Sequence, residues 1–211
     1  MAKGYFSKRR NFLYYRYVEQ IVSVLASDAR SYLDVGSSNA EYIERFRWIP
    51  VRHTVDIRHP YTSPNVVGFE QDFFTFQPEE KYDFVSCFQV LEHIPDAAAF
   101  AQHLTQMADR VLVSVPFLWP KGSCRHHVHD PVDLEKLSGW FGRAPDYSIV
   151  VEEPLRKLAK GRRLIAYYHN AGEMPSYVDL RKNQRKAGST RKKTGQVTPR
   201  TYPAAAAKTE A

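Results

Sequence analysis

The sequence predicts an α/β fold in which helices cover both faces of a doubly wound, mostly parallel sheet. Short apolar segments of strand composition alternate with amphipathic helical segments over residues 11–168. Two of the apolar segments, residues 82–88 and 110–115, are nearly continuous, which is typical of strands buried on both faces. With 211 residues, 43% of them hydrophobic, the chain is long enough for one domain with a buried core.

The first half of the pattern contains two predicted helices, over residues 11–26 and 40–46. The first is amphipathic, because Ile21 and Leu25 fall on the same side of a helix. The second follows Gly36-Ser37-Ser38-Asn39, a turn and helix-start signal. The strands of this half are short and are predicted at residues 32–35, 53–57 and 65–69.

The second half begins with the two apolar runs and ends with two further strands, predicted at residues 148–152 and 162–168. A helix opens at Pro95-Asp96 and extends to about residue 107, and a shorter one covers residues 131–140 with Asp130 as its N-cap. The link between the last two strands is too short for a helical crossover between parallel neighbours. One of these two strands is therefore predicted to be antiparallel to the rest.

The basic residues are concentrated at the C-terminal end of the chain. Lys and Arg number 30 against 23 Asp and Glu, but residues 181–211 hold nine of the basic residues and one Glu. Residues 1–180 are therefore close to neutral, and the basicity does not indicate a nucleic-acid-binding domain. We predict an N-terminal helical lid segment over residues 1–30, a folded domain over residues 31–172, and a basic, disordered tail over residues 173–211.

The two cysteines, Cys87 and Cys124, exclude a disulfide scaffold and a four-cysteine zinc site. This composition fits a reducing compartment. Arg16 and Glu19 interrupt the segment after the basic N-terminus, so we expect no secretory signal. No apolar run approaches the length of a membrane span. We therefore expect a cytoplasmic protein.

Acidic residues lie at or just after the ends of three successive predicted strands: Asp34, Asp56 and Asp72. In an open parallel sheet, ligands bind at the carboxyl ends of the strands, near the point where the strand order reverses. Gly36 permits a tight turn there, and an acid at the spacing of Asp56 suits the hydroxyls of a ribose. Asp72 is placed to reach an adenine amine, with Phe73 packing on the base. The pattern predicts a nucleoside-type ligand, although any one acid alone would also serve as a helix cap.

The same segments resemble the motifs of a known family. Tyr32-Leu33-Asp34-Val35-Gly36-Ser37 resembles the first motif of class I S-adenosylmethionine-dependent methyltransferases, and Val55-Asp56-Ile57 is similar to their second-strand acid. Residues 82–94, which include Val90-Leu91-Glu92-His93, are similar to the fourth-strand segment of the small-molecule and glycan branch. The likeness spans residues 31–168 and implies a Rossmann-like, seven-stranded sheet with one antiparallel strand. It makes residues 31–172 the methyltransferase domain.

The resemblance implies S-adenosylmethionine as the cofactor and assigns the residues that bind it: Asp34, Gly36, Ser37, Asp56, Ile57, Asp72, Phe73, Gln89 and Val90. The first two would line the methionine portion, and Gln89 and Val90 would lie beside the sulfonium. Glu92 and His93 are equally compatible with ligand contact and with packing at a helix entry. The family motif usually has two or three glycines, whereas Gly36 is followed here by residues that tolerate turns less freely.

Histidines cluster after the fifth predicted strand, in Cys124-Arg125-His126-His127-Val128-His129-Asp130. This location is the sheet edge predicted for the cofactor. Transfer of a methyl group to a hydroxyl requires removal of the hydroxyl proton, and histidine titrates near neutral pH. We predict His127, His129 and His126 as catalytic residues, with Asp130 orienting one of them. The alternative is a polar loop that leads into the next helix.

A metal site is a second interpretation of this segment. His127, His129 and Asp130 would ligate a divalent ion that binds two sugar hydroxyls. The sequence does not make a complete ligand set obvious, so we do not favour a metal as a cofactor.

The favoured function is S-adenosylmethionine-dependent transfer of a methyl group to a hydroxyl of a small molecule or glycan. Residues 115–131 also resemble methyltransferases of bacterial glycan and lipopolysaccharide biosynthesis. One alternative is a nucleic-acid methyltransferase guided by the basic tail, and another is a non-catalytic cofactor-binding module. The aromatic residues of the first helix are expected either to cover the cofactor or to pack in the core: Phe12, Tyr14, Tyr15 and Tyr17.

Overall fold

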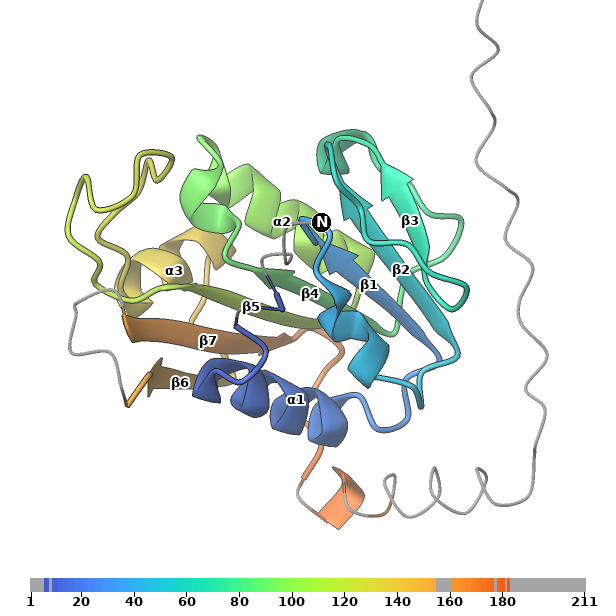
Figure 1. Cartoon of the computed structure of the whole chain (residues 1–211). Helices are drawn as coiled ribbons and strands as arrows, with labels where there is room; N and C mark the ends of the chain where they lie inside the picture. Colours follow the sequence, from blue (N-terminus) through green and yellow to red (C-terminus); the bar gives the residue numbers. More distant parts are fainter. Residues whose placement is uncertain (1–5, 8, 155–160, 177, 181, 183–211) are drawn as a thin grey trace, which may run out of the picture.

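The computed structural model describes residues 6–7, 9–154, 161–176, 178–180 and 182. Seven strands form one sheet in the order β3-β2-β1-β4-β5-β7-β6 (Figure 1). The strands are β1 (Ser31–Val35), β2 (Val51–Asp56), β3 (Val67–Glu70), β4 (Phe84–Phe88), β5 (Arg110–Pro116), β6 (Tyr147–Glu152) and β7 (Arg162–His169). The predicted fold class is confirmed.

Strand β7 is the antiparallel strand. It pairs antiparallel with β5, where Arg110 faces His169, and antiparallel with β6, where Tyr147 faces Tyr167. The other pairs in the sheet, from β3 through β5, are parallel. This arrangement agrees with the prediction from the short link between the last two strands.

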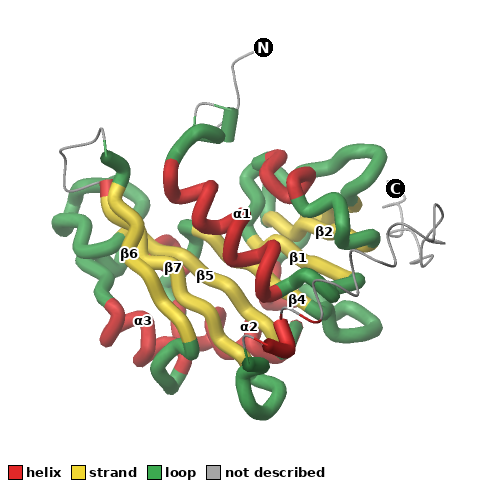
Figure 2. The backbone as a smooth tube through the Cα atoms, turned by 90° about the horizontal axis from the view of Figure 1, so that it is seen from below, coloured by secondary structure: helices red, strands yellow, loops and turns green. Residues whose placement is uncertain are grey.

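Helices cover both faces of the sheet, as predicted. The helical elements are α1 (Leu13–Leu25), η1 (Glu41–Arg45), η2 (Phe73–Thr75), η3 (Leu91–His93), α2 (Ala97–Met107) and α3 (Leu134–Phe141). Figure 2 shows α1 lying across one face, with α2 and α3 on the other. Each face has its own apolar core. One core joins α1 and η1 to residues such as Tyr32 and Tyr167, and the other joins α2 and α3 to residues such as Leu33 and Tyr168.

Two predicted helices differ from the structure. Residues 40–46 form the short 3₁₀ helix η1 rather than a longer helix. The helix predicted over residues 131–140 begins at Leu134, and its N-cap is Asp133, which accepts a hydrogen bond of 2.8 Å from the Lys136 amide. Asp130 is not the cap, because His127 engages its carboxylate.

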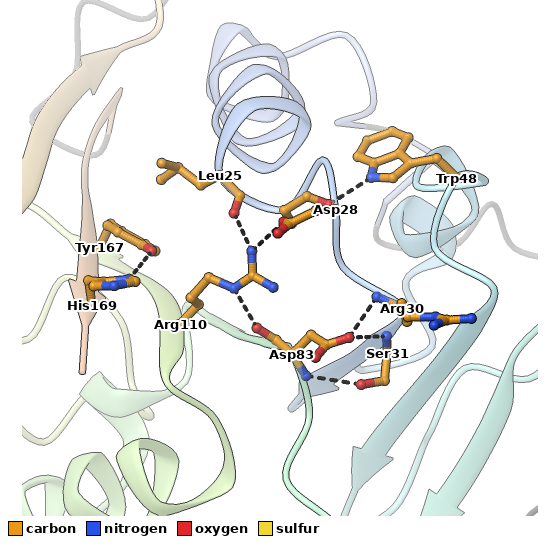
Figure 3. A network of polar contacts seen from close by, with 10 residues as sticks. Leu25, Asp28, Arg30, Ser31, Trp48, Asp83, Arg110, Tyr167 and His169 are labelled. Atoms are coloured by element: carbon orange, nitrogen blue, oxygen red, sulfur yellow. Dashed lines mark hydrogen bonds and ion pairs between the residues drawn. The ribbon is translucent and has the colours of Figure 1, made fainter. Parts of the chain in front are cut away.

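Arg110 joins the amino ends of the central strands, at the edge of the sheet away from the predicted site (Figure 3). Its guanidinium donates to the Asp83 carbonyl at 2.8 Å, the Leu25 carbonyl at 3.0 Å and the Asp28 carboxylate at 2.6 Å. The Asp83 carboxylate in turn accepts from the Arg30 and Ser31 amides. These contacts tie the end of α1 to β1, β4 and β5.

The described structure continues past residue 172. Residues 178–180 are helical, and Leu180 packs partly buried against the core beneath α1. The prediction of a disordered tail falls mainly on residues 183–211, which lie outside the described residues. None of the helices in the described part of the chain has the length and apolar character needed to cross a lipid bilayer.

Candidate functional site

A cavity of about 760 Å³ opens at the carboxyl ends of β1, β2 and β4. The strand order reverses between β1 and β4, so the cavity lies at the switch point where ligands bind in such sheets. All the predicted cofactor-binding residues line it: Asp34, Gly36, Ser37, Asp56, Ile57, Asp72, Phe73, Gln89 and Val90. His127 lines the same cavity.

The loop after β1 has left-handed backbone at three positions. Gly36 has φ +77°, and a Cβ atom there would collide with the side chain of Val90. Ser38 and Asn39 also have positive φ, at 44° and 57°. Ser38 and Asn39 therefore hold, at some cost in backbone energy, conformations that glycine adopts freely.

Asp34 lies at the deep end of the cavity, with its side chain 1% exposed. Its Oδ1 atom accepts hydrogen bonds from the hydroxyls of Tyr42 and Ser86. Burial raises the pKa of Asp34 to about 6, and the two hydroxyls partly oppose this shift. The Oδ2 atom is buried and has no hydrogen-bond partner among the described residues. It is therefore left to accept a proton donor such as a ligand ammonium group.

Asp56, which was predicted to bind ribose hydroxyls, also holds together the loops after β1 and β2. Its Oδ2 atom accepts from the Ser38 amide at 2.8 Å, and its Oδ1 atom accepts from the Arg58 and His59 amides at 2.9 Å each. A carboxylate has about four acceptor positions, so capacity remains for a ribose hydroxyl. The neighbouring Ile57 is 64% exposed and lines the cavity. This apolar side chain offers a surface for a flat ring.

The segment after β3 contributes a carboxylate and two rings. Asp72 caps η2 by accepting from the Phe74 amide at 3.0 Å and lines the cavity. Phe73 is 5% exposed, and its ring lies 4.8 Å from that of Phe100. Phe74 is 43% exposed and also lines the cavity. Phe73 therefore supports the core from the edge of the cavity, while Phe74 presents the more accessible ring.

Helix α1 is fixed against the cavity by polar contacts. The buried Glu153 carboxylate accepts from the Leu13 and Tyr14 amides at 3.0 Å each, which satisfies the free amides at the start of the helix. The Tyr14 hydroxyl shares a 2.6 Å hydrogen bond with Ser114, and Gln89 donates to the same Ser114 oxygen at 3.2 Å. Tyr14 and Tyr15 line the cavity, whereas Phe12 and Tyr17 are not among its lining residues.

His127 lies at the other end of the cavity. Its Nδ1 atom donates to the Asp130 carboxylate at 2.7 Å, and the side chains of the two residues are 5% and 1% exposed. Its ring stacks on Trp119 with a centroid separation of 5.6 Å. These contacts fix the ring and leave Nε2 as the nitrogen available to a ligand.

Glu92 and His93 lie beside His127 and line the cavity. The rings of His93 and His127 are 4.7 Å apart, edge to face. The His93 Nδ1 atom donates to the His126 carbonyl at 3.0 Å. Burial raises the pKa of Glu92 to about 8, with nearby Asp130 adding to the shift and Arg163 opposing it.

The other two predicted catalytic histidines do not line the cavity. His129 donates from Nε2 to the Ile94 carbonyl at 2.8 Å, and its ring packs edge to face on Trp140. His126 is exposed, and its backbone carbonyl, rather than its ring, contacts His93. The alternation of the histidines in sequence did not place them on one side, because the loop turns through Cys124 and His127.

Two residues had no role assigned from the sequence: Tyr42, which lines the cavity, and Ser114, which contacts lining residues from behind. Tyr42 comes from η1, and its hydroxyl reaches Asp34 across the turn. Ser114, in the middle of an apolar strand, joins Tyr14 to Gln89. A lone serine inside a buried run is a signal that could have been noticed, since a buried hydroxyl requires a partner. The sequence around Tyr42 contains no comparable signal.

The family of the chain is clear from comparison with known proteins. A family model described as "Methyltransferase domain" matches residues 6–182. The chain therefore belongs to the methyltransferase family, in the class I, S-adenosylmethionine-dependent fold group that its motifs resemble. S-adenosylmethionine is the cofactor of this family. Among curated proteins, none matches the sequence significantly.

Solved structures share the fold at low sequence identity. The N-methyltransferase NodS from Bradyrhizobium japonicum WM9, in complex with S-adenosyl-L-homocysteine, has a TM-score of 0.57 and 14% identity, covering 81% of this chain and 90% of that chain. The 1,6-didemethyltoxoflavin-N1-methyltransferase from Burkholderia thailandensis has a TM-score of 0.59 and 16% identity, covering 76% and 80%. The N-terminal domain of EvdMO1, in the presence of S-adenosylhomocysteine and D-fucose, has a TM-score of 0.52 and 13% identity, covering 74% and 82%.

Proposed function

We propose that this methyltransferase transfers its methyl group to a hydroxyl of a small molecule or glycan. The observation that carries the proposal is the hydrogen-bonded pair of His127 and Asp130 at one end of the cavity that holds the predicted cofactor residues. An imidazole oriented by a buried carboxylate is the arrangement that activates hydroxyls in many enzymes.

The cofactor occupies the end of the cavity formed by the loops after β1, β2 and β3. Asp34 accepts from the ammonium group of the methionine portion, and Asp56 accepts from the ribose hydroxyls. Asp72, Ile57 and Phe74 surround the adenine. Gln89 and Val90 lie beside the sulfonium, which directs the methyl group towards His127.

The reaction is an in-line displacement. A lone pair of the hydroxyl oxygen forms the new bond to the methyl carbon as the carbon–sulfur bond breaks, and its electron pair stays on sulfur. The hydroxyl proton leaves in the same process. We assign His127 to activation of this hydroxyl, either by accepting the proton or by coordinating a cation that lowers the hydroxyl pKa.

A sugar acceptor has specific support. Trp119 stacks on His127 at the acceptor end, and a flat aromatic side chain suits the apolar face of a sugar ring. The similar EvdMO1 domain was crystallised in the presence of D-fucose. We place the enzyme in glycan biosynthesis on these two observations, and in the cytoplasm because both cysteines are free in the structure.

Transfer of a deuterated methyl group from labelled S-adenosylmethionine to a panel of glycans and small metabolites tests the proposal. We expect the label in an O–CD₃ group, which deuterium NMR distinguishes from N–CD₃. A label that appears on nitrogen, or only in nucleic acid, would overturn the assignment of a hydroxyl acceptor. The N-methyltransferases among the similar structures make this distinction the essential readout.

A further inference from the structure

Three side chains with metal-ligating atoms converge at the acceptor end of the cavity. Glu92, His93 and His127 each place one such atom within 4.8 Å of the others. A Glu92 carboxylate oxygen lies 3.9 Å from His93 Nε2. Glu92 and His93 come from η3 and His127 from the loop after β5, so the approach of His127 to the other two results from the fold rather than from one local turn.

Hydrogen bonds hold His93 and His127 in the tautomer that a metal ligand requires, with the proton on Nδ1 and Nε2 free to coordinate. The His93 Nδ1 atom donates to the His126 carbonyl at 3.0 Å, and the His127 Nδ1 atom donates to the Asp130 carboxylate at 2.7 Å. Each ring therefore carries its proton on Nδ1 and presents a lone pair on Nε2. Outer carboxylate and carbonyl partners of this kind orient the histidine ligands of metal ions in proteins.

Glu92 supplies an independent observation. Its side chain is 1% exposed and lines the cavity, and its Oε2 atom has no hydrogen-bond partner among the described residues. A buried carboxylate without a partner is costly unless a cation or a proton compensates it. A divalent ion between Glu92 and the two imidazoles would compensate this charge.

We propose that Glu92, His93 and His127 bind one divalent transition-metal ion, and that this ion binds the acceptor oxygen. The second part rests on the proposed function. Two imidazoles and one carboxylate suit Mn²⁺, Fe²⁺, Co²⁺ or Zn²⁺ and leave coordination positions open. This ligand set differs from the one considered from the sequence alone, which was His127, His129 and Asp130. His129 is engaged with the Ile94 carbonyl, and Asp130 supports His127 from behind.

The side chains need only a small movement to close on an ion. Ligand atoms that share an octahedral ion at about 2.1 Å lie roughly 3 Å apart. His93 is the ligand with room to move, since its side chain is 37% exposed. In the bound state the acceptor hydroxyl coordinates the ion and loses its proton to water, and the resulting alkoxide attacks the methyl carbon. The carbon–sulfur bond breaks, and S-adenosylhomocysteine leaves with the electron pair on sulfur.

Titration of the full-length protein with Co²⁺, after removal of bound metal by a chelator, tests the site. We expect visible absorption bands that saturate at about one equivalent, and saturable Mn²⁺ binding by calorimetry. Glu92→Gln, His93→Ala and His127→Ala should each weaken Co²⁺ binding at least about tenfold. His169→Gln is the matched control, because His169 lies opposite Arg110, at the edge of the sheet away from the cavity. This variant should bind Co²⁺ as tightly as the wild type does.

Calorimetry with S-adenosylmethionine on the same preparations separates the two proposals. If the cofactor binds but Co²⁺ and Mn²⁺ do not saturate, or if all variants bind them equally, the metal site is wrong and the methyltransferase assignment stands. If the cofactor itself does not bind the wild type, the proposed function fails whatever the metal result. Thermal melting of each variant shows whether a loss of metal reflects unfolding.

Discussion

The side chain of Val90 occupies the space that a Cβ atom at Gly36 would need. Val90 belongs to the loop after β4 and Gly36 to the loop after β1, so the two loops touch at the point where the strand order reverses. The close approach makes Gly36 necessary for two separate reasons, its positive φ of 77° and this contact. Substitutions can separate the effect of the backbone conformation from the effect of the contact with Val90.

Gly36→Ala should lower the affinity for S-adenosylmethionine at least about tenfold, because left-handed backbone costs a non-glycine residue about 1–2 kcal/mol and the new methyl group displaces Val90. The double variant Gly36→Ala/Val90→Ala removes the collision but keeps the backbone cost. Calorimetry should therefore show partial recovery. A single variant with wild-type affinity, or a double variant no better than the single, would contradict this account of the loop.

Asp56→Ala should weaken cofactor binding by about 1–3 kcal/mol, the usual cost of leaving buried polar partners unpaired. Both a ribose contact and the Ser38 amide would lose their acceptor. Glu70→Ala is the control, because Glu70 faces Asp56 across β2 and β3 but is exposed. Equal affinities for the wild type and Asp56→Ala, in a folded protein, would remove Asp56 from the cofactor site.

His127→Ala should lower the turnover on the true acceptor by about 100-fold or more, the usual contribution of a positioned acid–base group. The affinity for S-adenosylmethionine should stay nearly the same, because His127 lies at the acceptor end. Steady-state turnover and calorimetry are measured on the same preparation, with His169→Gln as the histidine control. Full turnover in His127→Ala would mean that the pair with Asp130 is structural.

His53 should contribute a loss of stability as the pH falls from about 6.5 to about 4, whereas the raised pKa values of Asp34 and Glu92 act in the opposite direction. The His53 side chain is 3% exposed, lies 2.7 Å from the Tyr82 hydroxyl, and burial lowers its pKa from 6.5 to about 4. The unfolded chain takes up the proton near pH 6.5 and the folded chain only near pH 4. The stability that the neutral ring contributes is thus complete above pH 6.5 and is lost towards pH 4.

Urea unfolding of the wild type and of His53→Gln at pH 7.5 and pH 5 isolates this contribution, because Asp34 and Glu92 are present in both proteins. His53→Gln cannot take up the proton, so the free energy of unfolding of the wild type, measured relative to that of the variant, should fall by about 2 kcal/mol between the two pH values. The same pH dependence in the variant and the wild type would show that other groups cause the loss.

Much of the fold could be predicted because buried parallel strands leave continuous apolar runs such as the one that became β4. The residues predicted to bind the cofactor could also be placed at one cavity, since Asp34 and Asp56 lie at the carboxyl ends of β1 and β2 and these ends meet at one edge of the sheet. The positions of the histidines could not be predicted in the same way, because they depend on how the loop after β5 turns. The Glu92 carbonyl accepts from the Val128 amide at 2.9 Å, and this contact directs His127 inward and His129 towards Ile94. No local pattern encodes a hydrogen bond between residues so far apart in sequence.

The carboxylates of Asp34, Asp56 and Asp72 have a consequence for what happens after the reaction. They line the cavity in which we propose that the cofactor binds, and the cofactor has a positively charged sulfonium. Methyl transfer removes that charge, because the sulfur becomes a neutral thioether. Opposite charges attract strongly in a partly buried site, so the attraction weakens when the methyl group departs. This electrostatic contribution should therefore favour the fresh cofactor over the spent one, and calorimetry with each of the two molecules measures the difference.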